Sequence, residues 1–227
     1  MKRYKTIGIL GGMGPEATAE LYLRIIRIFQ QECQAKYDND FPEIVILNLP
    51  LPDVVENPKE ERVVERMLVA GVKKLETAGA EFVAIPCNTV TYFLSAMQEA
   101  VSIPILSILE ETVKEVQKLG IGKVGIVGTE MTISKNIYGK VLENVKLITP
   151  SVAEQKAITG IIMNILAGNK CRDDQQRLEK ITKDLKSQGA EKVILGCTEL
   201  PLLIDGDDFL NTTKILAKAV VKKCMEE

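Results

Sequence analysis

Two stretches of the chain decide the fold: GAEFVAIPCNT at residues 79–89 and GAEKVILGCTE at residues 189–199. Each begins with Gly-Ala-Glu and continues through an apolar run of the kind that forms a buried parallel strand. In each, the cysteine (Cys87 or Cys197) stands 8 positions after the opening glycine. Two βα units can look alike by chance, but composition alone does not produce matched cysteines. We therefore interpret the chain as two similar halves.

A second similarity supports this duplication, since GILG at residues 8–11 resembles GIVG at residues 125–128. Apolar runs also alternate with helical stretches along the whole chain, which predicts βαβ crossovers and a mainly parallel sheet with helices on its faces. The expected strands cover residues 5–10, 44–49, 82–85, 103–106, 123–127, 146–148 and 192–195. The expected helices cover residues 15–34, 60–78, a segment ending near 119, 134–142, 153–167, 175–188 and 212–227. The helix over 60–78 is expected to bury Val63, Met67, Ala70 and Leu75 and to end at Gly79.

Composition excludes several classes of protein. The chain has 227 residues and a formal net charge of -2, with only short basic clusters, so no nucleic-acid partner is expected. No apolar run reaches the length of a membrane span, and the first residues do not read as an export signal. We therefore expect a cytoplasmic protein that does not bind a membrane.

The cysteines and the missing histidine narrow the chemistry. The chain has 5 cysteines, widely spaced and without a CxxC pair, which favours free thiols in a reducing compartment. It has 0 histidines, which excludes Ser-His-Asp and Cys-His catalysis and most zinc sites, so no metal is expected. Cys33, Cys171 and Cys224 are expected to be buried apolar residues or surface thiols.

Cys87 and Cys197 each follow an apolar strand, and ligands of open parallel sheets bind at the carboxyl ends of strands. If the halves face one another, the two thiols approach a ligand from opposite sides. A racemase needs this arrangement, because it removes the α-proton from one face and returns a proton to the other. The backbone N–H groups that follow each cysteine could bind the substrate carboxylate.

The chain resembles the aspartate/glutamate racemase family, and its aspartate racemase branch most closely. The resemblance spans nearly the whole chain. It is carried by IGILGGMGP (7–15), PCNT (86–89), PI (104–105), EET (110–112), GT (128–129) with Thr132 and Tyr138, and GCTE (196–199).

This resemblance implies an α/β fold of two pseudo-symmetric domains, with the active site in the cleft between them. The first domain would comprise residues 1–103 plus 212–227, and the second residues 104–211. It also implies a homodimer that acts on an amino acid without pyridoxal phosphate, metal or nucleotide. The implied catalytic residues are Cys87 and Cys197. The implied substrate-binding residues are Met13, Asn88, Thr89 and Thr198, with Thr129 and Thr132 as further candidates.

The chain departs from the aspartate racemase pattern at two positions. Val54 follows Pro-Asp where the family tends to have Arg, and Leu166 precedes Ala-Gly-Asn where the family tends to have Lys. Those cations would pair with the distal carboxylate of the substrate, which is costly to bury alone. Either Lys59, Arg62 or Lys170 replaces them, or the substrate is a neutral amino acid.

Other functions remain open. Residues 12–17 (GMGPEA) fit a dinucleotide-binding pattern, but the acid expected after the second strand is missing, and Pro15 removes one phosphate-facing N–H. A related hydantoin racemase, maleate isomerase or arylmalonate decarboxylase would keep the fold. The two cysteines favour racemisation over decarboxylation, which needs one proton donor. A non-catalytic binding relative would show no α-proton exchange.

Overall fold

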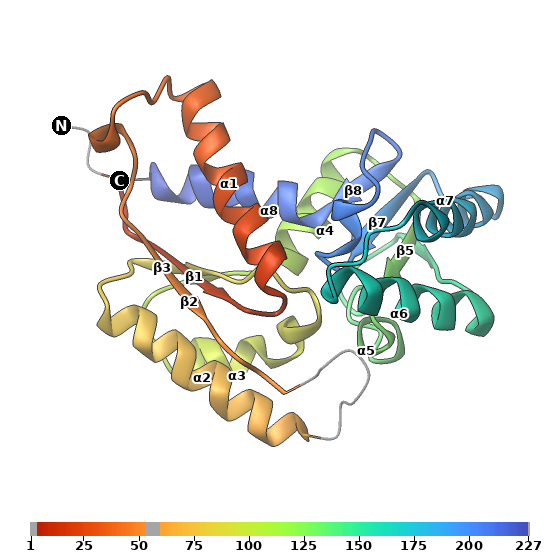
Figure 1. The fold of residues 1–227 in the computed structure, drawn as a ribbon, viewed down its shortest axis with the longest axis horizontal. Helices are drawn as coiled ribbons and strands as arrows, with labels where there is room; N and C mark the ends of the chain where they lie inside the picture. Colours follow the sequence, from red (N-terminus) through yellow and green to blue (C-terminus); the bar gives the residue numbers. More distant parts are fainter. Residues whose placement is uncertain (1–3, 53–59, 227) are drawn as a thin grey trace. The chain divides into compact units, whose positions relative to one another are not determined.

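The structure, a computed structural model, describes residues 4–52 and 60–226. Its strands form two four-stranded parallel sheets (Figure 1). The first has the order β2 (Ile44–Asn48), β1 (Ile7–Gly11), β3 (Phe82–Ala84) and β4 (Ile105–Leu106). The second has the order β6 (Lys146–Ile148), β5 (Lys123–Gly128), β7 (Lys192–Gly196) and β8 (Phe209–Asn211). Because the two orders are equivalent, the predicted α/β class and its internal duplication are confirmed.

The described residues divide into two compact units. Residues 4–52, 60–111 and 213–226 form unit 1, and residues 112–212 form unit 2. The sequence placed the boundary earlier, after residue 103. The difference arises because β4 pairs with β3, which keeps residues 104–111 with the first sheet.

Helices cover both faces of the unit 1 sheet. Figure 1 shows α1 (Pro15–Glu32) and α8 (Thr212–Cys224) on one side, and α2 (Glu61–Thr77) and α3 (Leu94–Glu99) on the other. Side chains of α1 and α8 share one buried core with β1 and β3. The last helix thus packs on the first sheet, as the resemblance implies. The helix α4 (Ile108–Lys118) spans the point in the sequence where unit 1 gives way to unit 2.

The buried face of α2 differs from the prediction. Val63 and Met67 are only half-buried and Ala70 is exposed, whereas Leu75 is buried as expected. The face that packs on the sheet consists of Val64, Leu68, Gly71, Val72 and Leu75. It is set by close packing against β1, since a Cβ on Gly71 would lie 2.7 Å from Leu10. The predicted stop is confirmed, because Gly79 follows the helix with φ 93°.

Unit 2 places α6 (Val152–Leu166) and α7 (Arg172–Ser187) in one core with β5 and β7. The predicted helix over 134–142 is wrong. The helix here is α5 (Glu130–Ser134), which starts earlier because the side chain of Thr129 caps it by accepting from Thr132 N. It ends early because Asn136 has φ 51°, a left-handed conformation.

The sequence also missed α3 and β8. Within the residues that the structure describes, no helix has both the length and the apolarity to cross a bilayer.

The repeated Gly-Ala-Glu has a structural explanation. Gly79 and Gly189 both have positive φ, and each helix before them ends with two bonds of a Schellman motif. Ala80 N donates to Leu75 O at 3.1 Å, and Ala190 N donates to Leu185 O at 3.2 Å.

The glutamate that follows then caps the neighbouring strand in each unit. Glu81 Oε2 accepts from Thr6 N at 2.8 Å. Glu191 Oε1 accepts from Gly122 N at 2.8 Å and from Lys123 N at 2.9 Å. The repeat therefore fixes where the cysteine-bearing strand begins.

Candidate active site

Cys87 and Cys197 occupy equivalent places in the two units. Cys87 follows the end of β3 by three residues, and Cys197 follows β7 directly. Each cysteine is 5% exposed. In each sheet the strand order reverses between the first and third strands in chain order, β1 and β3 or β5 and β7. This is the switch point where open α/β sheets bind ligands, so each cysteine lies at the expected ligand-binding edge of its own sheet.

The loop after β3 is held by its own backbone. Cys87 N donates to Ile85 O at 2.8 Å. Asn88 O accepts from both N and Oγ1 of Thr91, at 3.2 and 2.6 Å, where the 3₁₀ helix η3 (Thr89–Phe93) begins. Asn88 is 1% exposed and Thr89 is 3% exposed. Two buried polar side chains therefore follow this cysteine at the sheet edge.

The loop after β7 brings a carboxylate to its cysteine. Cys197 Sγ donates to Glu199 Oε2 at 2.9 Å, and Thr198 Oγ1 lies 3.4 Å from the same oxygen. Glu199 is 4% exposed and Thr198 is 2% exposed. A thiolate beside a carboxylate would place two negative charges in a buried site, which is unfavourable.

Glu199 was not among the residues singled out from the sequence. The signal was present, because Glu199 stands two positions after Cys197, where the other half has Thr89 two positions after Cys87. A charged residue at a buried strand end is unusual unless it is paired. Its burial, however, becomes visible only in the structure.

The remaining candidates are Met13, Thr129 and Thr132. They follow β1 or β5, the other strand at each switch point. Met13 is half-buried in the loop between β1 and α1. In the same loop Gly12 N donates to Thr18 Oγ1 at 2.9 Å. In unit 2, Thr129 and Thr132 are buried and their Oγ1 atoms lie 2.9 Å apart. The structure thus brings Thr129 and Thr132 together at the end of β5.

The remaining cysteines fit structural or surface roles. Burial raises the pKa of Cys224 to about 11, so this thiol stays protonated at neutral pH. Cys33 is half-buried, and its Sγ lies 3.6 Å from Met225 Sδ. Cys171 is exposed ahead of α7. Among the described residues, no group of three His, Cys, Asp or Glu side chains could hold a metal ion.

Other residues of the family motifs lie in structural positions. Tyr138 is buried and hydrogen-bonds with Thr112, while burial raises the pKa of its phenol. Leu166, the position where a lysine was expected, is 41% exposed at the end of α6. Arg62 and Lys170 are exposed. Val54 and Lys59 lie outside the described residues.

The sequence profile of the family described as Asp/Glu/Hydantoin racemase matches residues 10–220. The chain belongs to this family. The broad specificity amino-acid racemase RacX of Bacillus subtilis (strain 168) is 32% identical over 220 residues, which is 95% of this chain and 96% of that protein. The predicted family and enzyme class, an amino-acid racemase, are therefore confirmed.

Solved structures agree with this assignment. An aspartate racemase homologue from Pyrococcus horikoshii OT3 is 31% identical, with a TM-score of 0.79 over 100% of both chains. The aspartate racemase of Picrophilus torridus shares the fold at 24% identity, with a TM-score of 0.83 over 97% of this chain and 94% of that one. The loop after β1 has one backbone donor fewer to offer a phosphate group, because Gly12 N already donates to Thr18 Oγ1.

Proposed function

We propose that this racemase interconverts the L and D forms of an amino acid by two-base proton transfer, with Cys87 and Cys197 as the two acid/base groups. One observation carries the proposal. Two sheets of equivalent strand order each present one buried cysteine at the switch point where such sheets bind ligands. Duplication of the fold with retention of a thiol in each copy suits a reaction that needs one proton-transfer group for each face of Cα.

In this mechanism one cysteine is a thiolate and the other a thiol at the start of each turnover. The thiolate removes the α-proton, and the thiol delivers its proton to the opposite face of the carbanion. The next turnover in the reverse direction then starts from the exchanged protonation state. The titrations of the two thiols would therefore be coupled.

Glu199 is proposed as the positioning residue of Cys197. Cys197 Sγ donates to its carboxylate at 2.9 Å, which orients Sγ. When Cys197 acts as a base, Glu199 first takes the thiol proton, and the resulting thiolate then removes the α-proton, so the pair holds two protons. When Cys197 acts as an acid, Glu199 keeps its proton while the thiol delivers the other, so a thiolate never lies beside a carboxylate. Asn88, Thr89 and Thr198 are proposed to bind the substrate, because they are buried polar side chains next to the two thiols in sequence. Met13, Thr129 and Thr132 are proposed to line the same site from the neighbouring strands.

Neutral amino acids are proposed as substrates alongside aspartate and glutamate. Leu166 offers no charge to a distal carboxylate, and a relative that spans 95% of this chain is named a broad specificity racemase. Side-by-side kinetics with aspartate, glutamate and neutral L-amino acids would test this. A kcat/KM for aspartate far above that for every neutral amino acid would reject the proposed neutral substrates and leave the racemase proposal intact.

The chain is further proposed to act without pyridoxal phosphate, as a homodimer in the cytoplasm. The paired thiols supply the acid/base chemistry that the reaction requires. An absorbance spectrum of the purified active enzyme tests for a bound cofactor. Light scattering coupled to size-exclusion chromatography tests the dimer.

The deciding experiment follows the α-proton by NMR in D₂O. The purified protein, with a reducing agent and no added cofactor, is incubated with L-aspartate, L-glutamate and several neutral L-amino acids. We expect the α-proton signal to be lost with wild-type protein, and racemisation to be abolished in Cys87→Ala and in Cys197→Ala. Retention of racemisation in either variant would reject the two-cysteine mechanism.

A further inference from the structure

The end of β5 is held differently from the equivalent end of β1. In unit 1 the strand β2 runs beside β1 as far as Gly11, which pairs with Asn48, and Gly11 O accepts from Leu49 N at 2.9 Å. In unit 2 the strand β6 is shorter, and its last residue, Ile148, pairs with Gly125. The end of β5 therefore extends past β6.

A side chain takes the place of the shorter strand. Gly128 is the last residue of β5 and corresponds to Gly11 in the repeated motif. Its carbonyl oxygen accepts from Nε2 of Gln155, in the first half of α6, at 3.0 Å. Gln155 thus supplies from a side chain the N–H that Leu49 supplies from the backbone in unit 1.

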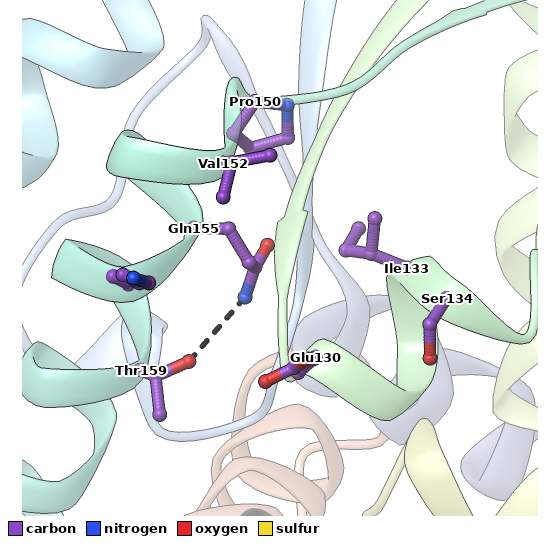
Figure 2. A pocket seen from close by; sticks show the side chains of 8 residues that line it. Glu130, Ile133, Ser134, Pro150, Val152, Gln155 and Thr159 are labelled. Atoms are coloured by element: carbon purple, nitrogen blue, oxygen red, sulfur yellow. Dashed lines mark hydrogen bonds between the residues drawn. The ribbon is translucent and has the colours of Figure 1, made fainter.

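The bond to Gly128 fixes the orientation of the Gln155 carboxamide. Gln155 and Thr159 line the hollow between α5 and α6, and Figure 2 marks the contact between them, which is 3.5 Å from Nε2 to Thr159 Oγ1. The contact with Gly128 O is shorter and therefore the stronger of the two. Because a carbonyl oxygen can only accept, the amide must turn its nitrogen toward β5.

The fold gains little from an amide at position 155. Its other atom, Oε1, is buried and has no hydrogen-bond partner among the described residues. A buried acceptor without a donor is costly, and a leucine of similar size would avoid this cost. The stability of unit 2 therefore does not account for the glutamine.

The peptide that Gln155 holds leads directly to candidate site residues. It joins Gly128 to Thr129, and because a peptide is planar, a fixed carbonyl also fixes the direction of the N–H that follows. Thr129 caps α5, and its Oγ1 lies 2.9 Å from that of Thr132. On the neighbouring strand, Gly128 pairs with Gly196, the residue before the cysteine of this unit. The held peptide thus sets the place of the two threonines.

We propose that Gln155 is a positioning residue for racemisation. It holds the Gly128–Thr129 peptide so that Thr129 and Thr132 meet the substrate in a fixed place. This inference rests on the proposed substrate contacts of the two threonines. Gln155 itself does not touch the substrate. In unit 1 the backbone donor after β2 does the same work.

The test compares Gln155→Leu with the wild-type enzyme. We expect kcat for racemisation to fall about 10-fold with a smaller change in KM, because the substrate is less well oriented toward the thiols. The melting temperature should stay close to that of wild type, because the loss of one bond is offset by the loss of a buried acceptor without a donor. Gln155→Glu, whose ionised carboxylate cannot donate, should lower kcat at least as far. Thr159→Val is the matched control, since it removes the weaker contact of the same amide and should leave kcat and KM unchanged.

Two further measurements separate positioning from a role in the fold. The NMR signal of the Gly128 carbonyl carbon should shift in Gln155→Leu and stay in place in Thr159→Val, which tests the bond without catalysis. The double variant Gln155→Leu with Thr132→Val tests the route. If Gln155 acts through the threonines, this variant should lose less activity than the product of the two single losses.

An unshifted Gly128 signal in Gln155→Leu, or an unchanged kcat, would overturn the proposal. It would also be overturned by a fall in kcat that follows a lower melting temperature and multiplies with the loss in Thr132→Val, because Gln155 would then serve only the fold. Full activity in Thr132→Val would remove the substrate contact on which the proposal rests. None of these outcomes bears on the two-cysteine mechanism, which fails only if Cys87→Ala or Cys197→Ala retains racemisation.

Discussion

The β1–β4 sheet of unit 1 and the β5–β8 sheet of unit 2 have equivalent strand orders, and each has a cysteine just past its third strand. Their connections differ. The helix after β1 has 18 residues, whereas the helix after β5 has 5 residues. Within the described part of each connection, one α-helix (α2) lies between β2 and β3, whereas two (α6 and α7) lie between β6 and β7. The strands and their caps have stayed alike while the connections have diverged.

The residues after the two cysteines differ as well. Asn88 and Thr89 follow Cys87, whereas Thr198 and Glu199 follow Cys197. Only the second pair includes a carboxylate, and it bonds to the thiol. The framework that places the two thiols is thus symmetric, but the side chains that follow them are not. In the proposed mechanism, the equivalent placement serves the two faces of Cα, and the single carboxylate distinguishes one thiol from the other.

The largest expected effect tests the equivalence of the thiols. Cys87→Ser and Cys197→Ser should each lower kcat/KM for racemisation by about 10³-fold, because a hydroxyl is a far weaker base than a thiolate. The measurement is chiral chromatography of the product at fixed times. Cys171→Ser, at an exposed position, is the control and should retain wild-type activity. If only one of the two serine variants lost activity, the equivalence of the halves would be rejected.

The next effect tests the asymmetry. Glu199→Gln should lower kcat by about 10²-fold with a smaller change in KM, because the amide keeps a hydrogen bond but cannot take the thiol proton. Glu199→Asp should recover part of the activity. A purely structural role for Glu199 predicts instead that the two variants lose activity in proportion to their loss of thermal stability and keep the wild-type pH dependence of kcat.

A third effect compares how tightly the two units pack around equivalent glycines. Gly8 and Gly125 are equivalent, and a Cβ at Gly8 would lie 2.9 Å from Ala80 Cβ, whereas one at Gly125 would lie 3.3 Å from Ala190 Cβ. Gly8→Ala should therefore lower the free energy of unfolding by about 2 kcal/mol, and Gly125→Ala by about half as much. Urea denaturation measures both. Adding Ala80→Gly should restore part of the loss in Gly8→Ala; no restoration would show that this contact does not limit the packing.

Sequence patterns predicted most elements because strands and long helices carry periodic apolar residues. They failed where structure depends on distant partners or single dihedral angles. The strand β8 has three residues and exists because it pairs with β7. The helix predicted over 134–142 is interrupted by the left-handed conformation of Asn136, which apolar spacing does not encode. The buried face of α2 shifted by one residue because Gly71 lets the helix approach Leu10 closely.

The sequence likewise predicted only part of the candidate site. The repeat was enough to place Cys87 and Cys197 at matching sheet edges, because each cysteine follows the third strand of its sheet. It did not identify Glu199, whose proposed role rests on a 2.9 Å contact with Sγ and on burial.

The smallest effect concerns the caps that precede the two cysteine strands. Glu81 accepts one backbone N–H in a partly buried bond, and Glu191 accepts two in an exposed position. Glu191 makes one bond more than Glu81, but water weakens its exposed bonds more strongly. Because these two differences offset one another, Glu81→Ala and Glu191→Ala should each lower the free energy of unfolding by about 1 kcal/mol. Urea denaturation of both, with the exposed Glu143→Ala as a control expected within about 0.5 kcal/mol of wild type, measures this. Equal losses would mean that both halves still depend on the same cap. A loss in only one would mean that the duplicated motif has kept its sequence in the other half after losing its structural role there.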